Sequence, residues 1–294
     1  SEAKLLFVGD VVWENLDETA MPDLEGIILL NDFSVLVSRN EKLTNARQNL
    51  NALFGKKFPM NFRKEHVSYY KDQPDEMLVL NYTSGSTGFS KGVMLPARSM
   101  WSNIQFGHEK LGKCLKAGDS IVSMLPMAHM YGLAFEFLYE FCYGCHIYFL
   151  TRMPSPKIIL QAFAEVKPKL VIAVPLIIEK IVKKNVLPKL ETPTMKFLMR
   201  VPLLNDKIKA KVREQMMNAF GGEFYQIIVG GAAFNQEIEA FLRSINFPYT
   251  VGYGMTECGP IISYEDWTKF KAGSCGKSAP RMEVKILSVD PQNV

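Results

Sequence analysis

The residues best suited to binding a charged ligand lie between Thr83 and Gly92, where the sequence is Thr-Ser-Gly-Ser-Thr-Gly-Phe-Ser-Lys-Gly. Glycines let backbone N–H groups approach a polyphosphate, hydroxyls donate to its oxygens, and Lys91 supplies a compact positive charge. The segment therefore predicts a phosphate-binding loop that suits ATP. Its spacing departs from the Walker A pattern, because Ser90 precedes Lys91 and Gly92 follows it. The composition alone is also typical of a Ser/Gly hairpin that binds nothing.

Three other short segments carry groups that could act on a phosphate ligand. His129 follows a predicted strand and a proline, where its imidazole could donate to phosphate or gate a channel, and both roles stay open. Residues 230–233 follow a buried apolar strand, at the edge where α/β sheets bind ligands. Glu257 offers the hard oxygen that Mg²⁺ prefers. A lone glutamate that is not part of a binding motif is usually a solvated loop residue.

Composition and charge exclude several classes of protein. With 48% hydrophobic and 22% charged residues, the 294-residue chain is expected to fold around a core and is not of the disordered class. A net charge of +4 is small for this length and argues against a nucleic-acid surface. The odd number of cysteines, five, and the absence of an export signal at residues 1–8 predict a cytoplasmic protein with reduced thiols. The apolar stretch 131–150 contains Glu136 and Glu140 and is predicted to be buried protein.

Apolar runs typical of strands alternate with stretches of helical periodicity, which predicts an α/β fold with a doubly wound, parallel sheet. Strands are predicted at 4–8, 26–30, 33–37, 77–82, 92–95, 120–125, 146–150, 170–174, 227–229, 249–252 and 282–287. Helices are predicted at 40–51, 99–111, 132–143, 157–166, 208–220 and 235–244. Residues 183–222 are rich in Lys and Met and are predicted to form a helical insertion on the surface.

In their order along the chain, these segments resemble the motifs of the AMP-forming, adenylate-forming ligases, the group of acyl-CoA synthetases, luciferases and peptide-synthetase adenylation domains. Residues 82–93 look like the family's phosphate loop and residues 125–132 like its histidine motif. Residues 230–233 look like its adenine-side glycine loop and residues 252–257 like its Tyr/Thr/Glu motif. A segment similar to its glycine-proline turn follows, with Ser278 where proline is more usual.

The resemblance implies the N-terminal large domain of such an enzyme, with two stacked, doubly wound α/β subdomains of mainly parallel sheets and the start of a small β-rich subdomain. We expect residues 1–115 to carry the phosphate loop 82–93, residues 116–266 the histidine, adenine and magnesium motifs, and residues 267–294 the beginning of the β subdomain. The family's ribose-binding aspartate and mobile C-terminal domain have no counterpart here. We therefore expect the chain to be a fragment that binds ATP weakly and adenylates poorly by itself.

The resemblance also implies roles for individual residues. Tyr253 would stack on adenine, Thr83 and Thr256 would donate to the α-phosphate region, and Glu257 would hold Mg²⁺. The residues expected to act in catalysis are Thr83, Lys91, His129, Thr256 and Glu257. The residues expected to bind the nucleotide are Thr83, Ser84, Gly85, Ser86, Thr87, Gly88, Lys91, Gly230, Gly231, Ala232, Ala233, Gly252, Tyr253, Gly254 and Thr256.

Residues 174–181 and 240–243, together with the helical insertion, look most like the long-chain fatty acyl-CoA synthetase branch. This resemblance implies activation of a fatty acid to acyl-AMP with ATP and Mg²⁺, followed by transfer to coenzyme A. Loading of a carrier-protein thiol, phosphoryl transfer and a non-catalytic nucleotide-binding fragment stay open as alternatives. The expected partners are fatty acid and nucleotide small molecules, with peripheral membrane contact and no nucleic acid.

Overall fold

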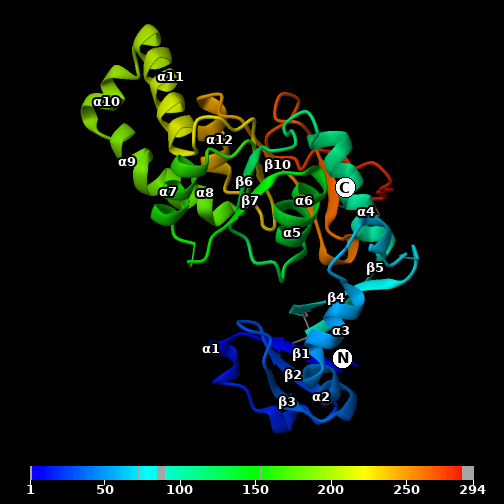
Figure 1. Cartoon of the computed structure of the whole chain (residues 1–294). Helices are drawn as coiled ribbons and strands as arrows, with labels where there is room; N and C mark the ends of the chain where they lie inside the picture. Colours follow the sequence, from blue (N-terminus) through cyan, green and yellow to red (C-terminus); the bar gives the residue numbers. More distant parts are fainter. Residues whose placement is uncertain (1, 72, 85–89, 153, 287–294) are drawn as a thin grey trace. The chain divides into compact units, whose positions relative to one another are not determined.

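The computed structural model describes residues 2–71, 73–84, 90–152 and 154–286 (Figure 1). The chain forms two compact units, Ser1–Lys71 and Asp72–Val294, called here the N-terminal and C-terminal units. This division was not predicted from the sequence. The predicted subdomain boundaries at residues 115 and 266 stay predictions.

The N-terminal unit is built around a three-stranded sheet with a small apolar core. Strand β1 pairs parallel with β2, and β2 pairs antiparallel with β3. Its elements are β1 (Leu5–Val8), α1 (Asp10–Trp13), η1 (Glu18–Ala20), β2 (Gly26–Leu29), β3 (Val35–Ser38), α2 (Glu41–Gln48), α3 (Leu50–Lys57) and η2 (Lys64–His66). Helix α2 begins after Asn40, whose side chain accepts a hydrogen bond from the Lys42 amide at 2.8 Å. The strands predicted at 4–8, 26–30 and 33–37 are therefore confirmed, with small shifts at their ends.

The C-terminal unit begins with an antiparallel hairpin of β4 (Met77–Ser84) and β5 (Ser90–Pro96). The two strands bracket the glycine-rich segment, as the sequence predicts. Helix α4 (Ala97–Phe106) follows directly and continues into η3 (Gly107–Leu111), a turn of π-helix. The hairpin and the helix are therefore joined without an intervening loop.

Parallel strands form the centre of the C-terminal unit. Strand β6 pairs with β7, and β9 lies between β8 and β10. The Lys169 amide donates to the Ser120 carbonyl at 3.1 Å, which links the start of β6 to the segment before β8. These strands are β6 (Ser120–Ser123), β7 (His146–Phe149), β8 (Val171–Ala173), β9 (Ile227–Val229) and β10 (Tyr249–Val251). Every residue of β8, β9 and β10 is buried, as expected when helices cover both faces of a parallel sheet.

The helices between these strands confirm the predicted doubly wound α/β fold. They are α5 (Met130–Leu133), η4 (Ala134–Leu138), α6 (Tyr139–Tyr143), α7 (Pro156–Val166), α8 (Pro175–Asn185) and α12 (Gln236–Ser244). Helix α12 begins after Asn235, whose side chain accepts from the Glu237 and Ile238 amides at 3.0 and 3.1 Å. None of the helices in the described residues is long and apolar enough to cross a membrane.

The predicted helical insertion is also confirmed. Residues 187–219 form α9 (Leu187–Leu190), α10 (Pro193–Leu198) and α11 (Pro202–Ala219). Helices α10 and α11 extend away from the parallel strands of their unit (Figure 1). Only the base of α11 enters the core, through Met216 and the following Phe220.

A small antiparallel sheet ends the described part of the unit. It contains β11 (Tyr253–Gly254), β12 (Ile261–Tyr264) and β13 (Lys277–Ser278), with the 3-10 turn η5 (Thr256–Cys258) between β11 and β12. The strand predicted at 282–287 is wrong over residues 282–286, which have no regular structure. The Met282 amide instead donates to the Ala279 carbonyl at 3.1 Å in a turn, and no described strand lies beside the segment. Leu287 lies outside the described residues.

The aromatic cluster around Phe220 offers a test of the packing. Phe220 is fully buried, with ring centroids 5.6 Å from Phe163 and 5.8 Å from Phe247. We expect Phe220→Ala to lower the free energy of unfolding by about 3–5 kcal/mol, measured by urea unfolding, because the cavity cannot close fully. Phe141, which is 67% exposed, is the control: Phe141→Ala should change stability by less than about 0.5 kcal/mol. Equal losses in the two variants would contradict the packing.

Candidate active site

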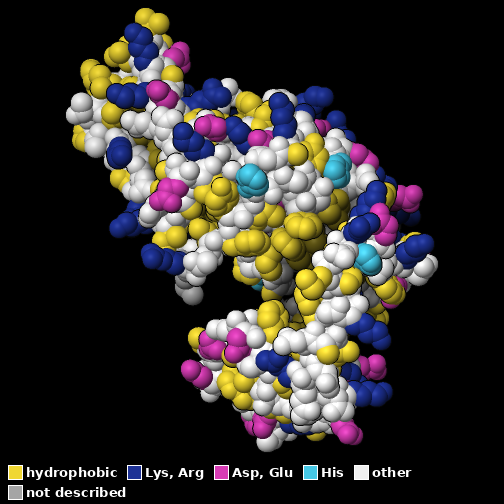
Figure 2. Space-filling model, in the orientation of Figure 1, with side chains coloured by type: hydrophobic (Ala, Val, Ile, Leu, Met, Phe, Trp, Pro, Cys, Tyr) yellow, Lys and Arg dark blue, Asp and Glu magenta, His cyan; other side chains and the backbone are white. Residues whose placement is uncertain are grey.

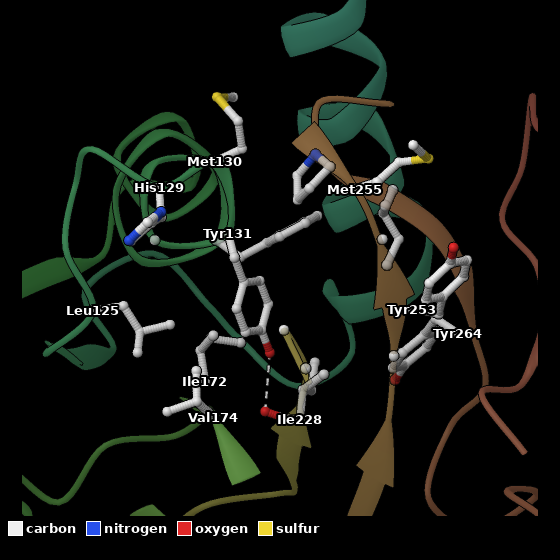
Figure 3. Close-up of a pocket in the computed structure, with 18 of the residues that line it drawn as sticks. Leu125, His129, Met130, Tyr131, Ile172, Val174, Ile228, Tyr253, Met255 and Tyr264 are labelled. Atoms are coloured by element: carbon white, nitrogen blue, oxygen red, sulfur yellow. Dashed lines mark hydrogen bonds between the residues drawn. The ribbon is translucent and has the colours of Figure 1, made fainter. Parts of the chain in front are cut away.

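An apolar cavity of about 360 Å³ lies within the C-terminal unit. Leu125, His129 and Tyr131 stand on one side of it, and Tyr253 and Met255 stand opposite (Figure 3). The predicted site residues that line it are His129, Gly230, Gly231, Gly252, Tyr253, Gly254 and Thr256. The structure therefore brings the histidine motif, the glycine loop and the Tyr/Thr/Glu motif to one place.

The cavity is formed where parallel strands end. Leu125 follows β6, Val174 follows β8, Gly230 follows β9 and Gly252 follows β10, and all four residues line it. The carboxyl ends of parallel strands meet at one edge of a sheet, and open α/β sheets bind ligands there. The chain's buried apolar runs therefore determine where the polar motifs meet.

Tyr131 closes the cavity over the glycine loop. Its hydroxyl donates to the Ile228 carbonyl at 3.0 Å (Figure 3). A Cβ on Gly230 would lie 3.1 Å from the Tyr131 ring, so any larger residue at position 230 would crowd this ring. Burial raises the pKa of the Tyr131 phenol, which keeps the hydroxyl protonated as a donor. Tyr131 was not among the predicted site residues, although it lies two positions after His129 in the histidine motif.

The β4–β5 hairpin sets two predicted phosphate ligands side by side. Thr83 is paired directly with Lys91 across the antiparallel ladder, which places their Cβ atoms about 5 Å apart. Asn81 on β4 donates to the Ala128 carbonyl at 2.7 Å and so joins the hairpin to the residue before His129. Residues 85–88 lie outside the described residues, as does the side chain of Ser84. The hairpin thus presents Thr83 and Lys91 together, next to the histidine motif.

The turn that carries Glu257 is held by one buried side chain, Asn103 of α4. The Asn103 carboxamide, 1% exposed, donates to the Cys258 carbonyl at 3.1 Å and accepts from the Ile261 amide at 3.0 Å. It also donates to the Ser99 carbonyl at 2.8 Å within its own helix. Because α4 continues directly from β5, Asn103 connects the β4–β5 hairpin to the turn η5. Asn103 was not among the predicted site residues, since a polar position in a predicted helix gives no sign of its partner.

Two carboxyl groups in the helices that follow the histidine motif are fully buried, Glu136 on η4 and Glu140 on α6. One oxygen of Glu136 accepts from the Met124 and Leu125 amides at 2.9 and 2.7 Å, at the end of β6. Neither oxygen of Glu140 has a hydrogen-bond partner among the described residues. Burial raises the pKa of each carboxyl to about 8. Glu136 therefore fixes the backbone that leads into the histidine motif and keeps its proton at neutral pH.

The remaining predicted residues do not line the cavity in the described part of the chain. Lys91 and Glu257 are exposed, and Ala232 and Ala233 are exposed beside Gly231. Thr83 is partly exposed on the hairpin. The roles predicted for these residues stay predictions.

The family of the chain is decided by comparison with known proteins. The family model described as AMP-binding enzyme matches residues 1–294, the whole chain. The chain belongs to the AMP-binding enzyme family. The resemblance drawn from the sequence motifs is therefore confirmed.

Individual members of the AMP-binding family are similar at lower identity. A long-chain-fatty-acid–CoA ligase of Schizosaccharomyces pombe is 29% identical over 73% of this chain and 34% of its own length. A 4-coumarate–CoA ligase of Solanum tuberosum is 26% identical over 75% of this chain and 36% of its own length. The chain thus spans about one third of the length of these curated relatives. The ATP-bound crystal structure of MatB from Rhodopseudomonas palustris has the same fold, with a TM-score of 0.63 at 17% identity over 95% of this chain and 46% of that one.

The residues of this chain suit a magnesium site that is completed by the phosphates of a bound nucleotide. No group of three or more His, Cys, Asp and Glu side chains in the described residues could hold a metal by itself. Glu257, however, has an exposed carboxylate that forms no ion pair with a described residue, and its neighbour Thr256 lines the cavity. Mg²⁺ is commonly held by one or two carboxylates, waters and substrate phosphates. Glu257 therefore suits this kind of site and not a cage built from protein ligands alone.

The buried carboxyls predict a pH dependence of stability. An unfolded glutamate loses its proton near pH 4.5, whereas Glu140 keeps its proton in the folded state up to about pH 8. Within that window of about 3.5 pH units the folded state binds more protons, so the free energy of unfolding should fall as the pH rises, by on the order of 5 kcal/mol for this group. Glu140→Gln should flatten the decline, measured by urea unfolding across the window.

Glu214, exposed on α11, provides the control for this prediction. Glu214→Gln should leave the decline as it is in the unsubstituted chain. A Glu140→Gln variant with an unchanged slope would contradict the assignment of a buried, protonated carboxyl.

Proposed function

We propose that the whole protein activates a carboxylic acid with ATP to form an acyl-adenylate and then transfers the acyl group to coenzyme A. One observation carries the proposal. In a chain that belongs to the AMP-binding family, the cavity at the ends of the parallel strands gathers the glycine loop, Tyr253 and Thr256. The hairpin that pairs Thr83 with Lys91 is tied to the same region through Asn81 and Asn103.

The proposed reaction has two balanced steps. A carboxylate oxygen attacks the α-phosphorus of ATP, the new P–O bond forms, and the bond to pyrophosphate breaks. The thiol of coenzyme A then attacks the acyl carbon, loses its proton, and releases AMP. Both steps concentrate negative charge on phosphate oxygens, which preorganised donors and cations stabilise. Lys91 and the hydroxyls of Thr83 and Thr256 are suited to this role, and His129 is suited either to bind phosphate or to gate the acyl channel.

Glu257 would hold Mg²⁺ against the phosphates of ATP. The bound ion would supply positive charge that offsets the charge building up on those oxygens. Tyr253, which is 51% exposed and lines the cavity, offers a flat face on which adenine can stack. Gly230 and Gly231, which also line the cavity, would let the backbone approach the base closely.

We propose a fatty acid as the acyl substrate. The cavity is lined largely by apolar side chains, among them Phe106, Leu111, Phe135 and Ile172, which can hold a hydrocarbon chain. The similar protein of Schizosaccharomyces pombe is named a long-chain-fatty-acid–CoA ligase. The similar protein of Solanum tuberosum is named a 4-coumarate–CoA ligase, so an aromatic acid is the competing substrate.

We also propose a cytoplasmic location. All five cysteines are free, and thiols stay reduced in that compartment. The proposed partners are the acid, the nucleotide and coenzyme A, together with peripheral membrane contact.

A product assay on the whole protein tests the proposed reaction. With ATP, Mg²⁺, coenzyme A and a series of fatty acids, we expect AMP and pyrophosphate in equal amounts together with acyl-CoA. ADP as the nucleotide product would indicate phosphoryl transfer and overturn the proposal. Turnover of 4-coumarate but of no fatty acid would overturn the proposed acyl substrate and leave the proposed reaction standing. Acyl transfer to a pantetheinylated protein but not to coenzyme A would assign the acceptor to a carrier.

Glu257→Gln tests the metal assignment. The substitution keeps the size of the side chain and removes the charge that would hold Mg²⁺, so we expect pyrophosphate exchange to fall by a factor of about 100 or more. Glu237→Gln, at an exposed position on α12, is the control and should keep full exchange. Exchange at the unsubstituted rate in Glu257→Gln would contradict the assignment.

A further inference from the structure

The helical arm formed by residues 183–213 carries a concentrated positive charge. It contains nine Lys and Arg residues and two acidic ones, a net charge of +7, whereas the whole chain has a net charge of +4 and the remaining residues therefore −3. None of these nine cations forms an ion pair with a described residue. The positive charge is thus available to an external anionic surface.

Large apolar side chains are exposed where α10 meets α11, at the free end of the arm. Phe197 is 67% exposed and Leu203 is 79% exposed, with Val201 and Leu204 beside them in sequence and also exposed. Apolar side chains gather at this free end, with Lys and Arg next to them (Figure 2). Exposed apolar side chains in a cluster mark an interaction surface.

The turn between the two helices holds this tip in place. The Asn205 side chain donates to the Met199 carbonyl at 2.9 Å, which fixes the end of α10 against the first turn of α11. Pro202 occupies the first turn of α11, where its fixed φ suits the start of a helix. The exposed side chains are therefore presented on a preformed turn.

Three cations lie among the apolar side chains of the tip, together with one acidic residue, Asp206. Lys196 precedes Phe197, and Arg200 precedes Val201. Leu203 and Lys207 lie four residues apart in α11, so they occupy neighbouring turns on one face of the helix. Surfaces that dock on membranes combine apolar groups that enter the acyl boundary with Lys and Arg that meet anionic head groups.

We propose that the tip of this arm, residues 195–207, docks the protein on a membrane that contains anionic lipid. Phe197 and Leu203 enter the interface, and Lys196, Arg200 and Lys207 meet the lipid head groups. The docking is independent of the proposed acyl activation, because no arm residue lines the cavity in the described chain.

Sedimentation with lipid vesicles tests the proposal. The protein should bind vesicles of equimolar phosphatidylglycerol and phosphatidylcholine at least tenfold more strongly than vesicles of phosphatidylcholine alone, and salt should weaken the binding. Two double variants, Phe197→Ser with Leu203→Ser and Lys196→Glu with Lys207→Glu, should each reduce binding about tenfold or more. Their thermal unfolding should match that of the unsubstituted chain, because all four side chains are exposed.

Matched substitutions elsewhere on the chain provide the controls. Phe141 is exposed to the same extent as Phe197, at 67%, and Phe141→Ser should leave vesicle binding unchanged. Lys157→Glu with Lys180→Glu changes the net charge by the same amount at exposed sites on α7 and α8 and should have a much smaller effect. Equal losses in the arm and control variants would overturn the proposal, because they would assign the binding to net charge alone. Absence of binding to anionic vesicles would also overturn it.

Discussion

The carboxamide of Asn103 connects the two parts of the candidate site that are proposed to act on phosphate, the β4–β5 hairpin and the turn η5. It lies on α4, which continues directly from β5. It forms hydrogen bonds with the backbone on both sides of Gly259, at Cys258 and Ile261. A buried amide that satisfies two backbone groups is strongly constrained, because removing it would leave a donor and an acceptor unpaired at about 1–3 kcal/mol each. The position of Glu257 relative to Thr83 and Lys91 therefore depends on this side chain. Hydrogen bonds made by a rigid helix place catalytic groups more accurately than loops do.

Close backbone packing supports the same turn. A Cβ on Gly254 would clash with the Pro260 carbonyl. Strand β11 can therefore lie this close to the start of β12 only because residue 254 is glycine. A Cβ on Gly132 would lie 2.7 Å from the Pro126 carbonyl, so the last residue of the histidine motif packs closely on the backbone near its start only because it is glycine. The motif glycines thus have a packing role in the cavity wall in addition to any contact with a nucleotide. Glu136, which accepts from the Met124 and Leu125 amides, fixes the backbone where that motif begins.

Features set by local pattern could be predicted from the sequence, and features set by distant partners could not. The buried runs of β8, β9 and β10 and the Lys-rich helical insertion follow directly from hydrophobic periodicity. Asn103 and Glu136 were missed as site residues, because their partners are backbone groups that only the tertiary fold brings near. The alternating pattern at 282–286 predicted a strand, but alternation requires a neighbouring strand to pair with, and the described structure places none there.

The most direct test of this account is the affinity for ATP with Mg²⁺, measured by titration calorimetry on Asn103→Leu and Asn205→Leu. Both substitutions remove a hydrogen bond to a backbone carbonyl, but Asn205 lies on the arm and does not line the cavity. Both should lower stability, whereas Asn103→Leu alone should weaken nucleotide binding, by about tenfold or more. Unchanged affinity in a folded Asn103→Leu chain would contradict the claim that this side chain positions the phosphate site.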